Sequence, residues 1–349
     1  MVSAPKDARK EIQVRKQTPR RWLLIAALAG AVVAALGLTV TSSRAGDGPH
    51  ADRSGQGDRN GRIAVTHRAF STTCCVETDD VMTMNPDGSD PRVITHSPSG
   101  GASGDPAWGL GGNVVYFDSD RAGNVHVFAT DAGGRLAVQL TRTDGFEFAP
   151  SPSPNGKLIA FEHDAADFSS GGIYVSGPFG GRIGNFRQLT SSPTAATGGF
   201  DTSPNFSPDG RTIAFQRVLS DSEAAVFVVG IDGQGLRQLT PYSLNAEYPR
   251  WSPDGTLIVF SSNTAFDQQQ VWVVGADGSG LTQLTQGTPG NPSFEPDWSP
   301  DGRQIVFAHF LPTGFFTQLE VMNADGSNVH VIWQGADFSY DVRPDWGGR

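Results

Sequence analysis

One seven-residue motif recurs in this chain and limits what the chain can fold into. It reads PNFSPDG from Pro204, PRWSPDG from Pro249 and PDWSPDG from Pro296, at intervals of 45 and 47 residues. A repeat of this length is typical of folds built from copies of one small sheet, because a single copy cannot bury its apolar face alone. The repeat therefore constrains the fold class before any local motif is considered.

Weaker copies extend the same pattern along the chain. Its six aligned prolines are Pro106, Pro150, Pro204, Pro249, Pro296 and Pro344. Two positions later, four of the six residues are tryptophan and one is phenylalanine; each unit continues with a short apolar strand, such as TIAF at 212–215. A second apolar strand, an Asp-Gly pair and a Leu-Thr pair follow in most units. Four short antiparallel strands per unit is the pattern of a propeller blade, with Ser-Pro-Asp-Gly as a tight turn and the aromatic residue packed between blades.

The two ends of the repeat region complement each other. Five complete units begin near residues 103, 147, 201, 246 and 293. Residues 61–96 lack only the beginning of a unit, and residues 341–347, DVRPDWG, supply only that beginning. Joined, they make a sixth blade that leaves no open edge. We therefore predict an all-β, six-bladed β-propeller over 61–349, closed by pairing of its N- and C-terminal segments and destabilised by loss of the last ten residues.

The segment before the repeats has the features of an export signal. Residues 1–21 carry a net charge of +5, and the next nineteen, WLLIAALAGAVVAALGLTV, carry none. As a helix the uncharged run would span about 28 Å, close to the roughly 30 Å of a bilayer core. We expect a basic cytoplasmic tail at 1–21, one N-terminal transmembrane helix (an anchor or uncleaved signal) at 22–41, a flexible linker at 42–60, and an extracytoplasmic propeller. Secretion after signal cleavage is the alternative.

Charge and missing motifs narrow the function. The chain has a net charge of −10, and the part after residue 60 carries −15. So acidic a body argues against a nucleic-acid partner, which needs a basic face. No nucleophile elbow, phosphate loop, His-Glu-x-x-His or dinucleotide fingerprint is present, which makes an enzyme less expected than a binding protein.

Acidic residues within three positions before the repeat prolines are the first candidate site. They are Asp105, Glu147, Asp201, Glu247, Glu295 and Asp341. If they point at the mouth of the central channel, they form a negative ring that would attract a divalent cation or a basic peptide. The alternative is a solvated acidic face.

Histidines and cysteines give two further candidates. His67, His163 and His309 follow the same strand in three units, either as a metal site or as separate histidines. Cys74 and Cys75 are adjacent and are the only cysteines. In an oxidising compartment they could form a vicinal disulfide, pair with another molecule, or remain free thiols.

These motifs resemble the TolB-type propeller repeat, a WD-repeat-like family. The shared pattern is Pro-x-Trp-Ser-Pro-Asp-Gly, a strand of Ile-Ala-Phe type, Asp-Gly and Gln-Leu-Thr, and it is specific in three units. Two units depart from it: Pro152 replaces the aromatic residue in one, and Gly109-Leu110-Gly111-Gly112 replaces Ser-Pro-Asp-Gly in another.

The resemblance covers about 61–349 and implies a six-bladed scaffold that binds proteins or peptides at one face or in its channel. We expect a membrane-tethered scaffold for a protein or peptide, with an envelope glycan as another partner class and no cofactor. A hydrolase or polysaccharide lyase that uses a divalent cation at the channel mouth is the alternative function.

Overall fold

The structure is a computed structural model. It describes residues 61–70, 77–98, 101–109, 111–177, 186–192, 199–220, 222–263, 268–287, 290–311, 316–335 and 339–348. The expected tail, transmembrane segment and linker, and both cysteines, lie outside these ranges. Among the described residues, no helix has the length and apolarity needed to cross a bilayer.

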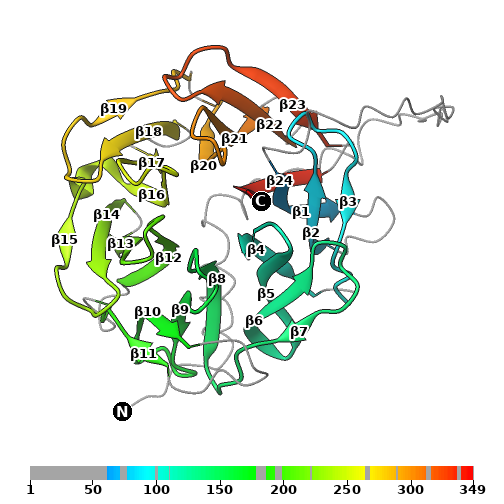
Figure 1. The fold of residues 1–349 in the computed structure, drawn as a ribbon, viewed down its shortest axis with the longest axis vertical. Coiled ribbons are helices and arrows are strands. Elements are labelled where there is room, and N and C mark those ends of the chain that lie inside the picture. Colours follow the sequence, from blue (N-terminus) through cyan, green and yellow to red (C-terminus); the bar gives the residue numbers. More distant parts are fainter. Residues whose placement is uncertain are drawn as a thin grey trace, which may run out of the picture. The chain divides into compact units, whose positions relative to one another are not determined.

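The described chain forms six four-stranded antiparallel sheets arranged around a central axis (Figure 1), as predicted. We number these blades 1 to 6, starting with the sheet that contains Ile63. Blade 1 holds, from the axis outward, β24 (Ser339–Trp346), β1 (Ile63–Phe70), β2 (Glu77–Met84) and β3 (Arg92–Val93). Blade 2 holds β4 (Ser103–Gly109), β5 (Val114–Ala122), β6 (Asn124–Asp131) and β7 (Val138–Gln139). Blade 3 holds β8 (Phe146–Pro152), β9 (Ile159–Asp164), β10 (Gly171–Ser176) and β11 (Arg187–Gln188).

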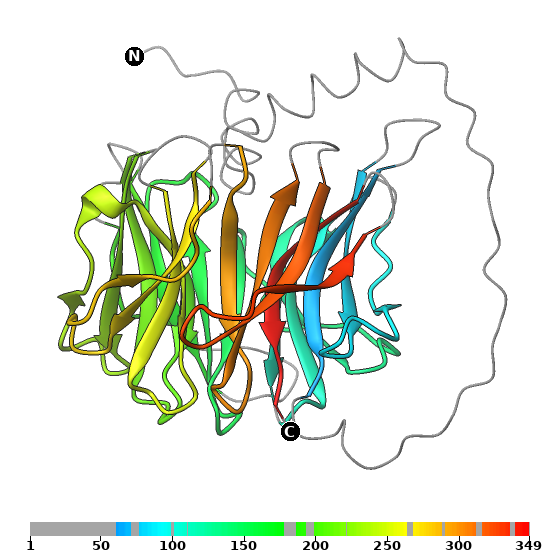
Figure 2. The same ribbon diagram turned by 90° about the horizontal axis from the view of Figure 1, so that it is seen from above.

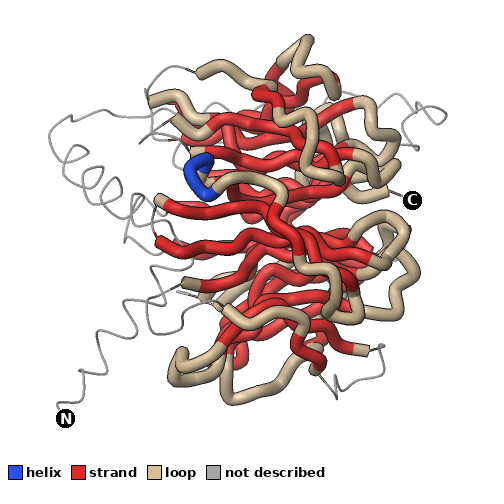
Figure 3. Tube along the Cα trace, turned by 90° about the vertical axis from the view of Figure 1, so that its left-hand side faces the viewer, coloured by secondary structure: helices blue, strands red, loops and turns tan. Residues whose placement is uncertain are grey.

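The other three blades repeat this order. Blade 4 holds β12 (Phe200–Phe206), β13 (Thr212–Ser220), β14 (Glu223–Gly230) and β15 (Arg237–Gln238). Blade 5 holds β16 (Ala246–Trp251), β17 (Leu257–Ser262), β18 (Gln270–Gly275) and β19 (Thr282–Gln283), preceded by a 3₁₀ turn at Tyr242–Leu244. Blade 6 holds β20 (Ser293–Trp298), β21 (Gln304–Leu311), β22 (Phe316–Asn323) and β23 (His330–Gln334). The innermost strands of blades 2–6 begin within one residue of the predicted starts, and the strands run through the thickness of the ring between two loop faces (Figure 3).

Blade 1 is built from both ends of the repeat region, which confirms the predicted closure. Strand β24 pairs antiparallel with β1, from Ile63 opposite Trp346 to Ala69 opposite Ser339. In Figures 1 and 2 the last strand accordingly lies directly beside the first. Since Ile63 is fully buried and Trp346 is only 5% exposed, the closure is also part of the core.

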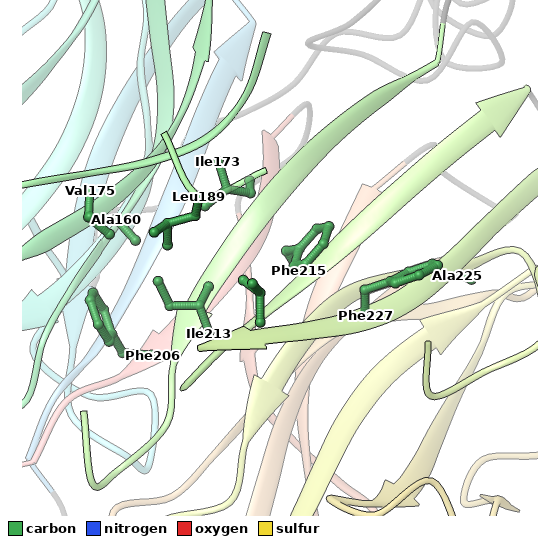
Figure 4. Packing of buried hydrophobic residues seen from close by; sticks show 10 residues of the cluster. Ala160, Ile173, Val175, Leu189, Phe206, Ile213, Phe215, Ala225 and Phe227 are labelled. Carbon is green, nitrogen blue, oxygen red and sulfur yellow. The ribbon is translucent and has the colours of Figure 1, made fainter. Parts of the chain in front are cut away.

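Apolar packing occurs mainly between neighbouring blades. In Figure 4 Phe206, Ile213 and Phe215 of blade 4 face Ile173 and Leu189 of blade 3. Ala214, which lies between Ile213 and Phe215 in the same strand, packs on blade 5, because successive side chains of a strand point to opposite faces. The repeated Ile-Ala-Phe strand therefore serves two interfaces at once. The aromatic column packs between blades as predicted, with Phe206, Trp251 and Trp298 each in or against such a cluster.

The Ser-Pro-Asp-Gly motif forms the predicted turn between the first two strands of a blade. In blade 4 the Ser207 hydroxyl donates to Asp209 (2.6 Å) and accepts the backbone N–H of Thr212 (2.9 Å). Gly210 has a φ of +67°, which a glycine adopts without a Cβ clash. Ser207, Asp209 and Gly210 of the motif thus each have a structural role.

The threonine of the Leu-Thr pair has a role that the sequence does not reveal. In four blades its hydroxyl accepts a backbone N–H of the third strand, and in blade 1 the threonine of Ile94-Thr95 does the same, at 2.8 to 3.0 Å. These threonines are Thr95, Thr141, Thr190, Thr240 and Thr285. The outer strand is short, and the threonine side chain satisfies a further backbone N–H of the third strand beyond its end. The third strand therefore has less unpaired edge.

Candidate functional site: the central channel and its tryptophan mouth

The residue before each repeat proline adopts a left-handed backbone conformation in all six blades. The φ angles lie between +49° and +54° at Asp105, Ala149, Ser203, Tyr248, Glu295 and Arg343. At these positions the innermost strand shifts register against the second strand, as in a β-bulge. Positive φ is uncommon outside glycine. The bulge is therefore a property of the fold, and all of these residues except Glu295 line a cavity of about 80 Å³ that five innermost strands surround.

Side chains of each blade accept backbone N–H groups of the next blade near this bulge. Five bulge residues donate their N–H in this way, to Thr66, Asp118, Gln216, Ser261 and Glu295. In a second set of bonds, the backbone N–H two positions after the proline donates to the side chain one position after the proline of the preceding blade; the acceptors are Ser151, Asn205, Asp297 and Asp345. Between blades 2 and 3 this second bond cannot form. Ala107 stands at the acceptor position and has no side-chain acceptor, and Pro152 stands at the donor position and has no backbone N–H. The innermost strands are thus linked around the axis.

The channel charges engage one another. Arg343 of β24 forms ion pairs with Asp105 and with Glu295, the latter at 3.7 Å, and lies over the Tyr248 ring. Burial lowers the pKa of Arg343 to about 10, and repulsion from the positive charge of Arg68 acts in the same direction. Burial also raises the pKa of Glu295 to about 7, against the hydrogen bond from the Arg343 backbone. The closing strand therefore places a cation between two of the candidate carboxylates.

The other four candidate carboxylates do not join them. Glu147, Asp201 and Asp341 are fully buried. Glu247 is half-buried and accepts a hydrogen bond from Gln269 (2.9 Å). Of the six carboxylates, two therefore lie at the bulge (Asp105 and Glu295), three are fully buried, and Glu247 is half-buried. Binding by any of them stays a prediction.

Each fully buried carboxylate pairs with a basic residue. Asp201 bonds Arg217 through both oxygens, each at 2.7 Å, and Asp341 Oδ1 lies 2.7 Å from His67 Nδ1. Glu147 lies between two imidazoles, with its Oε1 2.9 Å from His163 Nδ1 and its Oε2 2.7 Å from His126 Nδ1. Although burial alone would raise it, hydrogen bonds from His126, His163 and Thr143 lower the pKa of Glu147 to about 2.

The three predicted histidines therefore act separately, in blades 1, 3 and 6. His309 lies 3.0 Å from the Ser293 hydroxyl, as His67 and His163 lie beside their own carboxylates. The described residues contain no group of three or more His, Cys, Asp or Glu placed to hold a metal ion.

A second cavity lies at one end of the channel and was not predicted as a site. It has a volume of about 260 Å³, and its lining includes Trp108, Trp251, Trp298 and Trp346 together with Pro152. We call this cavity the tryptophan mouth. Asp297 and Asp345 also line it. A sequence signal existed, since Pro-Asp-Trp occurs only in these two units, at 296–298 and 344–346.

The buried carboxyls predict an unusual pH dependence of stability. Burial raises the pKa of Asp118 to about 7 and that of Asp297 to about 8, with the Asp345 charge adding to the latter, so the folded state binds more protons than the unfolded chain. Asp341 raises the pKa of His67, so that its contribution is present at low pH and lost as pH rises through that pKa. Glu147 acts oppositely, because its contribution is lost only as pH falls from about 4.5 toward 2.

We therefore expect the free energy of unfolding to fall by at least about 2 kcal/mol between about pH 5 and pH 8. Urea titrations across this range measure it. Asp118→Asn keeps an oxygen for the Ala149 N–H, now at 3.1 Å from Asp118, and should flatten the dependence. A free energy that rises steadily toward pH 8 would contradict this assignment.

Comparisons with known proteins agree with this architecture. A family model described as the TolB beta propeller domain matches residues 182–347. A Tol-Pal system protein TolB of Bordetella pertussis is 30% identical over 160 residues, which are 45% of this chain and 33% of that protein. An uncharacterized protein of Agrobacterium fabrum is 28% identical over 144 residues, 40% of this chain and 47% of that protein. The aligned part thus spans less than half of these relatives.

Similar solved structures show the fold alone. TolB from Acinetobacter baumannii superimposes with a TM-score of 0.67 at 19% identity, covering 84% of this chain and 68% of that chain. Hydrazine synthase of Kuenenia stuttgartiensis gives 0.60 at 14% identity, covering 81% and 46%. Since so different a protein shares the ring, the fold does not specify a function. The repeat pattern is more specific: the match to the TolB beta propeller domain over residues 182–347, together with the TolB relatives, confirms the resemblance to the TolB-type β-propeller repeat.

Proposed function

We propose that the ring is a binding scaffold for a protein or peptide, held on the extracytoplasmic side of a membrane by residues 22–41. The observation that carries the proposal is the tryptophan mouth, where four tryptophans and Pro152 are among the residues that line a cavity at one end of the channel. Tryptophan is among the residues most enriched in the energetically dominant centres of protein interfaces. The relative in Bordetella pertussis is named a Tol-Pal system protein, which agrees with a protein partner.

The channel chemistry supports binding rather than catalysis. Arg343 forms ion pairs with Asp105 and Glu295, and each fully buried carboxylate is paired with a basic side chain. A cation-dependent lyase or hydrolase needs several free oxygen ligands around one point. The described residues provide no such group of three.

Site-specific photo-crosslinking in the cells that make the protein tests the proposal. A benzophenone amino acid replaces Pro253, an exposed residue at the tryptophan mouth, and in a matched variant replaces Leu136, which is 70% exposed at the outer edge of blade 2. We expect discrete protein adducts with the first variant and none with the second. No adduct at position 253, or the same adducts at both positions, would contradict a partner site at the mouth.

A further inference from the structure

The tryptophan mouth combines aromatic walls with two carboxyl groups that lack an ionic partner. Asp297 is 8% exposed, and its Oδ2 accepts the Trp346 backbone N–H at 2.6 Å. Asp345 Oδ1 accepts the Trp108 backbone N–H at 2.8 Å. Neither forms an ion pair within the part of the ring that the structure describes. Asp297 is therefore buried and Asp345 half-buried, each with a hydrogen bond from a backbone N–H but without an ion pair.

The surrounding charges leave this pair undercompensated. Arg250 of β16 is the cation that acts on both carboxyls, and it forms an ion pair with neither. Its Nε is buried without a hydrogen-bond partner among the described residues. Burial, and for Asp297 also the Asp345 charge, raises the pKa of both carboxyls, to about 8 for Asp297. An added positive charge would favour the ionised forms that burial disfavours.

The walls suit an organic cation better than a metal ion. Calcium takes six to eight oxygen ligands, and the described residues contain no group of three that could hold an ion. Tryptophan, in contrast, is the best aromatic partner for an ammonium or guanidinium group. Trp298 is only 4% exposed, and its indole N–H has no partner in the described ring. A cavity of about 260 Å³ is below the usual size of small-molecule sites and is of a size for one side chain.

We propose that the tryptophan mouth receives one lysine or arginine side chain of a protein partner, with its stem against the indoles and its charged group at Asp297 and Asp345. The inference rests on the proposed scaffold function and specifies the chemistry of its partner. It predicts that recognition depends on one positive charge on the partner and on these two carboxyls.

Capped pentapeptides with lysine, arginine or norleucine at the centre of four glycines test the inference. The full-length protein, labelled with ¹⁵N at tryptophan, is titrated with each peptide, and the indole signals are assigned with single Trp→Phe variants. We expect the lysine or the arginine peptide to shift the signals of Trp108, Trp251, Trp298 or Trp346, with saturation at millimolar concentration. Norleucine, which keeps the stem and lacks the charge, should bind at least about tenfold more weakly, since cation–π and ionic contacts are lost.

The carboxyls are tested with the double variant Asp297→Asn and Asp345→Asn. Asparagine keeps an oxygen for the Trp346 and Trp108 backbone N–H groups, so the ring should keep its fold, which unchanged tryptophan signals outside the mouth would verify. Affinity for the charged peptide should fall at least about tenfold. Asp277→Asn, in an exposed outer turn, is the control and should bind normally.

Three results with a shifted signal would overturn the inference. They are equal binding of the norleucine peptide, unchanged affinity of the double variant, and shifts of the same signals by calcium chloride at lower concentration than by either charged peptide. Absence of any shift at about 10 mM peptide would also overturn it, because a preformed single-side-chain site should be detectable there. If adducts still form at position 253, the scaffold proposal survives this failure; if they do not, both fail.

Discussion

Removal of residues 339–349 is expected to abolish cooperative folding of the ring. The deletion removes β24, and with it the buried Asp341 and Trp346 and the whole inner edge of blade 1. It also leaves Glu295 without the Arg343 N–H, now 2.8 Å away, and Asp297 without that of Trp346. Loss of one buried tryptophan alone costs about 3–5 kcal/mol, and whole domains have only about 5–15 kcal/mol of stability.

Circular dichroism and urea unfolding of the protein that lacks residues 339–349 measure this effect. We expect no cooperative transition at ambient temperature, and recovery of one when a synthetic peptide of residues 339–349 is added, since the strand can pair with β1 from outside. Recovery with a peptide of scrambled order would show that the effect is unspecific. An unchanged unfolding midpoint after truncation would mean that the ring does not close through β24.

Glu147→Ala is expected to destabilise the ring by about 3–5 kcal/mol, the usual consequence of removing one member of a buried charged network. Glu147 is fully buried and accepts from Thr143 while lying within 2.9 Å of both His126 and His163. The substitution would leave these three polar groups without their shared partner and would create a cavity. Urea titration at about pH 7 measures the loss.

Two control substitutions separate the network from general sensitivity. Glu147→Gln keeps the size and one acceptor oxygen, and we expect it to recover part of the stability. Asp277→Ala removes a carboxylate from an exposed outer turn, where it accepts hydrogen bonds from Ser279, and should change the free energy by less than about 1 kcal/mol. If Glu147→Ala were as mild as Asp277→Ala, the buried network would not contribute to stability.

The repeat predicted the blades because it contains their turns and core strands. Ser207, Asp209 and Gly210 bond within five residues, so the motif carries its own turn information. The unmatched fragments at 61–96 and 341–347 likewise predicted the closure of β24 on β1. Local motifs and their count were sufficient for the fold.

The side-chain arrangement around the channel depends on a backbone feature that no residue type announces. Asp105, Ala149, Tyr248 and Arg343 have little in common chemically, yet all adopt positive φ before the repeat proline. The resulting bulge directs acids at different distances from the proline to different places. Asp105, one position before its proline, reaches the channel, whereas Glu147, three before, is buried in its blade.

The buried pairs left a trace that could have been found by comparing two columns of the repeat. An acid three positions before the proline occurs in three units, and each of these units has a basic residue directly opposite it in the second strand. The pairs are Asp341 with His67, Glu147 with His163, and Asp201 with Arg217. Taken separately, the acids suggested a channel ring and the histidines a metal site; taken together, they predict pairs across neighbouring strands.

Hydrogen exchange of the full-length protein tests ring closure most directly. The backbone N–H groups of Asp341, Arg343, Trp346 and Gly347 all donate to atoms outside β24, in blade 6 or at Arg62. If β24 completes blade 1, these amides should exchange as slowly as the buried amides of β1, because they open only when the ring opens. Rapid exchange of these four amides beside a protected β1 would contradict the closed six-bladed ring.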